Sequence, residues 1–219
     1  MVAMGHAHSL LGPLAEVVVR NRFWMLWNLI LAAVPLLLAV PLFRHQGRRG
    51  PGWWLGLGVV VLFLPNAPYV VTDLVHLRGD VMRAGTDGAV VGGVLPAYAA
   101  FVAAGFLLYT LVLREAGRFL QAQGLGRWRP GMEVALHLVC AVGVVLGRVA
   151  RLNSWEPVTD PDTTAGRVVD TLTWSRAPLA VAVLFVVIWA GHAVVRGAGR
   201  AVEVRLVAAL DTWLRPGTA

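Results

Sequence analysis

The chain has 219 residues, of which 58% are apolar and only 14% are charged, and its mean hydropathy is +0.68. A soluble domain carries about 25% charged residues, so this composition excludes an ordinary soluble fold and indicates a membrane protein. The net charge of +7 does not indicate nucleic-acid binding, because the arginines flank apolar runs as topology signals do. The single cysteine, Cys140, lies within an apolar run, which excludes an internal disulfide and gives no support for Cys-metal or redox chemistry.

Residues 1–22 are mixed in character, and we expect an N-terminal tail without a cleaved signal peptide. The first predicted span covers residues 23–43, a length that at about 1.5 Å per residue matches the roughly 30 Å hydrocarbon core. The second, 53–77, contains Pro65 and Pro68. Because each proline removes a backbone donor, we expect this span to be kinked or interrupted.

Three further spans are predicted at residues 89–113, 132–152 and 178–195. A polar stretch, 154–176, separates the last two and is expected to be a loop. Residues 196–219 are predicted to form a cytoplasmic amphipathic tail helix lying on the membrane surface, or a packing face for a partner. Its apolar stripe consists of Val202, Leu206, Ala209, Leu210 and Trp213.

The predicted fold is therefore all-α, a polytopic transmembrane bundle of about five spans over residues 23–195. With the N-terminus outside, the inner segments hold eleven arginines and the outer segments eight. The positive-inside rule then predicts an N-out, C-in protein of the bacterial cytoplasmic membrane. With five spans, loops 78–88 and 153–177 share one side of the membrane in either orientation.

Two polar clusters fall within or beside apolar spans, where such groups are expensive and indicate function. Asp73 and His76 are three residues apart and share a helix face, as do Arg148 and Arg151. We expect both clusters at the same side of the membrane, lining one pocket. The candidate ligand-binding residues are Asn66, Tyr69, Asp73, His76, Arg148, Arg151, Asn153, Trp155 and Glu156.

The segments LFLPNAPYVVTDLVHL and LGRVARLNSWE resemble the hallmarks of an uncharacterised bacterial membrane family, domain of unknown function 1361. The resemblance covers roughly residues 25–195. It implies a multi-span inner-membrane protein and brings no activity, ligand or catalytic residue with it.

Each polar residue has a structural alternative. For Asp73, an ion pair with Arg148 or Arg151 that locks spans two and four together is favoured over a ligand role. For Arg151, a structural role and a guanidinium left free for an anionic ligand weigh equally. For Pro65 and Pro68, a simple kink is favoured over an unwound stretch that faces a ligand.

The histidines and glycines point to packing more than to chemistry. A metal site of Asp73, His76 and Glu156 is weakly indicated, and we predict no metal. We expect His137 and His192 to be packed and locally hydrogen-bonded. Three Gly-x-x-x-Gly pairs predict close helix packing, within the chain, in a homo-oligomer or with a membrane partner. They are Gly52/Gly56, Gly88/Gly92 and Gly143/Gly147.

Three functions remain open. The favoured hypothesis is a binding or accessory protein whose outer-face pocket holds an anionic small molecule or lipid headgroup. The second is a membrane enzyme for a lipid-linked substrate, with Asp73 or His76 as candidate general base. The third is a small transporter or channel subunit. No nucleotide-binding, hydrolase, zinc-protease or Cys-x-x-Cys motif is present. We therefore lean against catalysis and predict membrane lipids as partners, no cofactor and no nucleic acid.

Overall fold

The computed structural model describes the backbone of residues 2–45, 47 and 49–214 and the side chains of residues 12, 14–45, 47, 49–203 and 205. Within this part every regular element is helical. Four of the five predicted spans fall inside helical segments long and apolar enough to cross a membrane, and the fourth, 132–152, extends two residues past the end of its segment. The all-α, five-span prediction is confirmed. The five segments are Leu14–Arg44, Pro51–Ala84, Asp87–Ala122, Gly126–Ala150 and Ala177–Glu203.

The first span belongs to one long helix, α1 (Val2–Arg44). No structural boundary separates the predicted tail, residues 1–22, from the span that follows it. Most side chains of that tail lie outside the described residues, but from Leu14 onward α1 packs against the rest of the chain, with Val17 and Met25 buried.

The second span bends at its prolines without breaking. The Tyr69 N–H still bonds to the Pro65 carbonyl at 3.0 Å, and the Asn66 side-chain amide donates to the Phe63 carbonyl at 2.9 Å. Beyond the two prolines the helix continues as a 3₁₀ stretch over residues 70–76. The span therefore stays helical through both prolines, and the unwound alternative is wrong. In order, the segments are α2 (Pro51–Phe63), α3 (Asn66–Tyr69), η1 (Val70–His76) and α4 (Leu77–Ala84).

The third and fourth spans each contain one π-helical stretch. The third consists of α5 (Asp87–Ala89), η2 (Val90–Val94) and α6 (Leu95–Ala122). Most of the predicted loop 78–88 is therefore helical, and the chain reverses at Gly85, whose φ of +71° suits glycine. The fourth span consists of η3 (Gly126–Trp128), α7 (Arg129–Val145) and η4 (Leu146–Ala150).

The polar stretch predicted as a loop at 154–176 forms two short helices, α8 (Glu156–Thr159) and α9 (Pro161–Thr173). The Asp160 carboxylate caps α9 by accepting a hydrogen bond from the Thr163 N–H. The pattern of apolar residues did not predict this helix start. The last helix, α10 (Ala177–Leu214), runs on past residue 196 without a break. The predicted tail is thus continuous with the fifth span, and most side chains of its apolar stripe lie outside the described residues.

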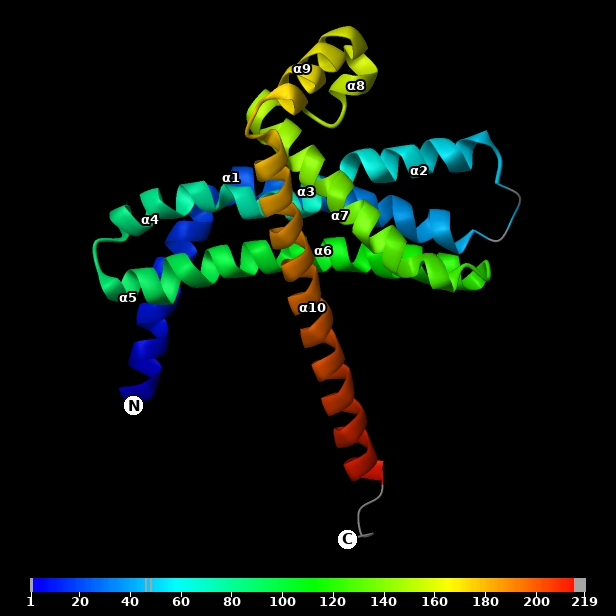
Figure 1. The fold of residues 1–219 in the computed structure, drawn as a ribbon. Helices are drawn as coiled ribbons and strands as arrows, with labels where there is room; N and C mark the ends of the chain where they lie inside the picture. The colour runs from blue at the N-terminus through cyan, green and yellow to red at the C-terminus, as the bar shows by residue number, and fades with distance from the viewer. Residues whose placement is uncertain (1, 46, 48, 215–219) are drawn as a thin grey trace.

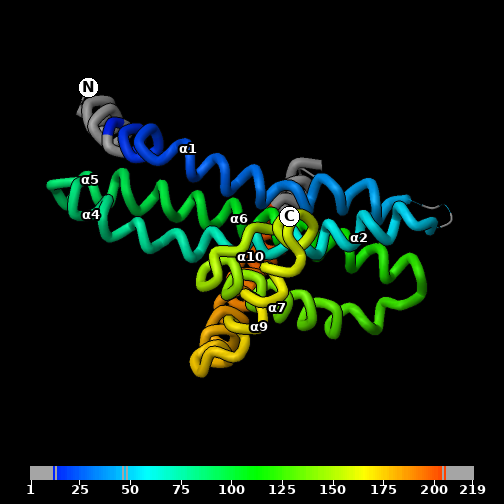
Figure 2. The backbone as a smooth tube through the Cα atoms, turned by 90° about the horizontal axis from the view of Figure 1, so that it is seen from above, coloured from blue at the N-terminus to red at the C-terminus, as the bar shows by residue number. Residues whose placement is uncertain are grey.

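The helices do not form a bundle of five parallel rods. Figures 1 and 2 show α1, the second span and α6 running alongside one another, whereas α10 crosses them steeply. Helix α10 packs on α6 and α7, and the α8–α9 segment lies near its beginning. The turn between α4 and α5 lies far from α8 and α9 in Figure 1, so the two segments predicted to share a membrane side do not meet.

Small residues allow close approach where helices meet. A Cβ atom on Gly143 would lie 2.7 Å from the Pro65 Cβ, and one on Gly147 would lie 3.2 Å from the Tyr69 ring. The predicted Gly143/Gly147 face therefore packs against the proline bend inside the chain, which leaves it unavailable to a partner. On the other side of the bend, a Cβ on Gly105 would lie 2.6 Å from the Ala67 carbonyl oxygen.

We expect the substitution Gly105→Ala to destabilise the protein by about 1–3 kcal/mol, because its methyl group would overlap backbone that cannot move aside cheaply. The buried Cys140 thiol provides the measurement, since a thiol-reactive dye labels it only as the detergent-solubilised protein unfolds. Gly58→Ala is the matched control, because open space surrounds that position. It should leave the melting temperature unchanged or slightly higher, and equal melting of both variants would contradict this packing.

Candidate functional site

A cavity of about 370 Å³ lies beside the proline bend, between α1, α3, the end of η4 and the segment 151–155. We call it the bend pocket. The candidate residues Asn66, Tyr69, Arg151, Asn153 and Trp155 all line it. The structure thus brings together five of the nine residues that the sequence singled out, from segments more than eighty residues apart.

Arg151 is the most unusual residue of the bend pocket. Its φ of +54° and ψ of +36° make it the one non-glycine residue with positive φ in the described part of the chain. This left-handed conformation ends η4 at a position where glycine is usual, at a cost of about 1–2 kcal/mol for an L-residue. Among the described residues, no side chain or carbonyl pairs with its guanidinium by hydrogen bond or ion pair.

Asn66 connects the bend to the segment that carries Arg151. Besides the Phe63 carbonyl, its amide nitrogen donates to the Ser154 hydroxyl at 2.9 Å. Asn153 in turn donates to the Glu156 carboxylate at 2.7 Å, which lies 3.6 Å from the Arg167 guanidinium of α9. Glu156 therefore supports the segment without lining the bend pocket.

Asp73 does not form the predicted ion pair. Its carboxylate is 4% exposed and accepts a hydrogen bond from Asn28 of α1 at 2.7 Å. Arg148 donates instead to the Thr72 carbonyl at 3.3 Å, and neither Arg148 nor Arg151 lies within ion-pair distance of Asp73. The reason is that Asn28 and Trp24 of α1 contact Asp73 and His76 of η1, so this acid joins spans one and two instead of spans two and four.

His76 lies outside the bend pocket as well. Its ring packs against Trp24 of α1, with centroids 5.1 Å apart, and the side chain is otherwise exposed. Asp73, His76 and Glu156 have separate partners. In the part of the chain that the structure describes, no three His, Cys, Asp or Glu side chains come together as metal ligands do.

Trp27 and Asn28 of α1, which were not among the predicted site residues, also line the bend pocket. Asn28 lines the bend pocket and donates a hydrogen bond to Asp73, which does not line it. Asp73 therefore contacts the pocket only through the Asn28 amide. The sequence signal that could have identified Asn28 is a polar amide within an apolar span, next to a tryptophan expected at the membrane interface.

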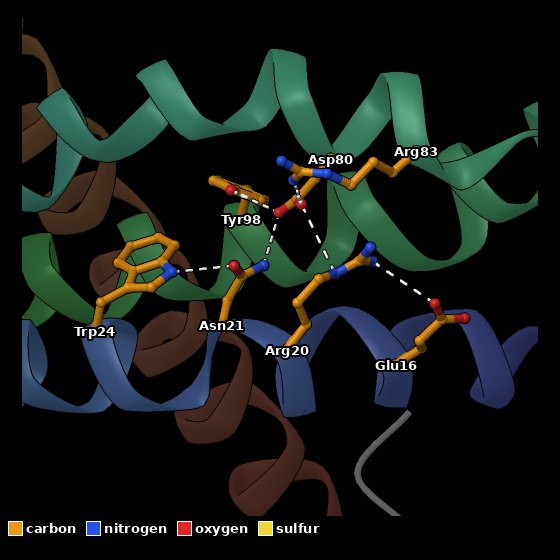
Figure 3. Close-up of polar contacts among 7 residues, drawn as sticks. All are labelled: Glu16, Arg20, Asn21, Trp24, Asp80, Arg83 and Tyr98. Carbon is orange, nitrogen blue, oxygen red and sulfur yellow. Dashed lines mark hydrogen bonds and ion pairs between the residues drawn. The ribbon is translucent and has the colours of Figure 1, made fainter.

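A second polar cluster centres on Asp80 of α4, which is 1% exposed (Figure 3). Its carboxylate accepts hydrogen bonds from Asn21 at 2.6 Å and from the Tyr98 hydroxyl at 2.9 Å. Arg83 and Arg20 lie 3.0 and 3.8 Å from it. The cluster joins α1, α4 and α6, and every oxygen of the acid has a partner, which indicates a structural role. This cluster was not predicted from the sequence, because Asp80 falls in the segment expected to be a loop.

The two histidines of the last spans lie together at a third place. The His137 Nδ1 and the Tyr109 hydroxyl are 2.7 Å apart, and the His192 Nδ1 and the Thr110 hydroxyl are 3.1 Å apart. The expectation of packed, satisfied histidines is confirmed for His137. For His192 it is wrong, because its buried Nε2 has no hydrogen-bond partner.

The chain belongs to the family described as protein of unknown function (DUF1361), whose model matches residues 27–190. This range includes both hallmark segments and all the residues that line the bend pocket, and it confirms the resemblance. No curated protein and no solved structure matches the chain.

We expect Asp80→Ala to lower the stability of the detergent-solubilised protein by about 2 kcal/mol or more. The change leaves the buried Asn21 amide and Tyr98 hydroxyl without their acceptor, at about 1–3 kcal/mol each. Asp170→Ala removes an exposed acid and serves as the control. A melting temperature of Asp80→Ala that matches this control would show that the cluster does not hold α1, α4 and α6 together.

Proposed function

We propose that this integral membrane protein is a binding protein whose bend pocket holds an anionic group, namely a lipid headgroup. The observation that carries the proposal is the unpaired guanidinium of Arg151 at a pocket with several other polar side chains. Arginine presents a planar fork of donors that matches phosphate oxygens, and it is less strongly hydrated than lysine. An arginine without a protein partner, held in a strained conformation, is the expected arrangement for binding an anion.

The walls of the bend pocket suit the polar part of a lipid. Asn66, Asn153 and Ser154 place amide and hydroxyl groups beside Arg151, and the Asn66 amide already fixes one edge of this polar surface. Trp27 and Trp155 are partly exposed at the rim. Tryptophan favours the headgroup level of a bilayer, so the occupant would lie where a phosphodiester normally sits.

Binding fits the pocket better than catalysis or transport. A general base must reach the reacting group, but Asp73 is enclosed against Asn28 and His76 packs on Trp24, both outside the pocket. A transporter needs a polar path, but the bend pocket is also lined by apolar side chains such as Leu31 and Leu62. By the arginine count above, we propose that the pocket opens on the outer face of a bacterial inner membrane.

The test is the substitution Arg151→Gly, which separates binding from stability. Glycine accepts the left-handed backbone, so the melting temperature should not fall and stability could rise by about 1 kcal/mol. Loss of the charged donor should weaken phosphatidylglycerol binding about tenfold, since a hydrogen bond to a charged group contributes roughly 1.5–3 kcal/mol. Native mass spectrometry in mixed phosphatidylglycerol and phosphatidylcholine micelles counts the bound lipids.

Arg176→Gln is the control, because it removes an exposed arginine that does not line the bend pocket. It should retain the same number of bound phosphatidylglycerol molecules as the unchanged protein. If Arg151→Gly stays folded and binds as much phosphatidylglycerol as the control, the proposed function is refuted.

A further inference from the structure

A second cavity, of about 330 Å³, opens where α6 and α10 separate. The two helices cross at Gly191, where an added Cβ would overlap the Phe106 ring. Beyond this contact, α6 and α10 diverge, because their steep crossing carries them apart (Figure 1). We call the space between them the arginine wedge. It is lined by one stripe of α6, from Leu107 to Gln121, one stripe of α10, from His192 to Glu203, and Arg129.

Five arginines line the wedge, and two of them lack a partner among the described residues. Arg118 lies 2.8 Å from Glu115, while Arg129 and Arg196 share Glu133 at 2.9 and 3.2 Å. Arg114 of α6 and Arg200 of α10 have no such acid, and Glu203 is the only acid in the lining. The wedge is therefore strongly positive, and like charges face each other across it unless an anion lies between them.

The closed end of the wedge holds an unsatisfied polar atom. His192 is 4% exposed and lines the cavity, and its Nδ1 is taken by the Thr110 hydroxyl. Its Nε2 has no hydrogen-bond partner. Such an orphan is rare in a folded interior and costs free energy unless a ligand or water meets it. This is an observation independent of the arginines.

We propose that the arginine wedge is a second anion site that binds a phosphate group, carried by an anionic phospholipid or present as free phosphate. Arg114 and Arg200 bind the phosphate oxygens from opposite walls. Arginine forks match phosphate geometry, and both side chains are free to turn toward it. His192 Nε2 supplies a further hydrogen bond at the closed end.

The position of the wedge fits this ligand. Leu107, Leu111 and Val195 line it alongside the charged groups, as contact with acyl chains requires. Its arginines belong to the segments that the arginine count predicts to be cytoplasmic, and basic pockets between spans on that side are typical sites for anionic headgroups. The bend pocket shares none of its lining residues, so this proposal does not depend on the proposed function.

The test uses the double variant Arg114→Gln/Arg200→Gln of the full chain in nanodiscs. Phosphatidylglycerol in a phosphatidylcholine background should bind at least about tenfold more weakly than to the unchanged protein. The matched control, Arg127→Gln/Arg205→Gln, removes two exposed charges that do not line the wedge and should bind normally. Equal phosphatidylglycerol binding by the two double variants would exclude a lipid phosphate as the ligand of the wedge.

Two further arms identify the source of the phosphate and guard against misfolding. If inorganic phosphate raises the melting temperature of the unchanged protein but not of the double variant, and phosphatidylglycerol does not, the ligand is free phosphate. If neither probe distinguishes the two proteins, the wedge is not a phosphate site. Should the double variant fail to fold, Arg200→Gln alone, on an exposed turn of α10, replaces it under the same criteria.

The two sites are separable in one experiment. Arg151→Gly should remove one bound phosphatidylglycerol and the wedge variant a different one, so the combined variant loses both. His192→Phe, which removes Nε2 but keeps an aromatic ring against Tyr109, should weaken wedge binding and leave binding at the bend pocket intact. Loss at both sites from either variant would contradict separate binding.

Discussion

The structure depends on how the second span satisfies its backbone after Pro65 and Pro68 remove two donors. In a bilayer no water replaces them, so the carbonyls need protein partners. The Asn66 side chain serves the Phe63 carbonyl at the bend and also donates to the Ser154 hydroxyl. Together with the bond from Arg148 to the Thr72 carbonyl, the Ser154 contact joins the end of the fourth span to the second span. The absence of a Cβ on Gly143 lets Pro65 sit against α7, and the bend pocket is the space left beside this junction.

The same requirement explains how the acidic groups are used. Asp73 and Asp80 lie on the second span, and each is held by an asparagine of α1, Asn28 and Asn21. At Asp73 this neutral amide joins a buried carboxylate to another helix without burying a second charge, which avoids part of the desolvation cost of an ion pair. Asp80, by contrast, also has Arg83 and Arg20 beside it. Because Asp73 is held by an amide, it takes up neither Arg148 nor Arg151.

The sequence was sufficient for the spans, the bend and five of the residues that line the bend pocket, because hydropathy, proline and intramembrane polarity each have direct physical consequences. It was not sufficient for the partner of Asp73, since periodicity shows that Asp73 and His76 share a face but not which helix covers it. The buried role of Asp80 was not predicted, because a polar helix end and a loop have the same composition. The arginine wedge was not predicted, because it depends on the angle between α6 and α10, which no local sequence pattern encodes.

The arginines fall into two groups, those paired with a glutamate inside the protein and those beside a cavity without an acidic partner. Arg118, Arg129 and Arg196 surround Glu115 and Glu133, so their charges are largely used within the protein. Arg151 at one end of the fourth span, and Arg114 and Arg200 near the other, have no such acid among the described residues. An intramembrane protein gains no stability from a free guanidinium beside a cavity. The free arginines beside cavities are therefore the basis on which we propose an anion at each site, and at a membrane surface the most abundant anion is the lipid phosphate itself.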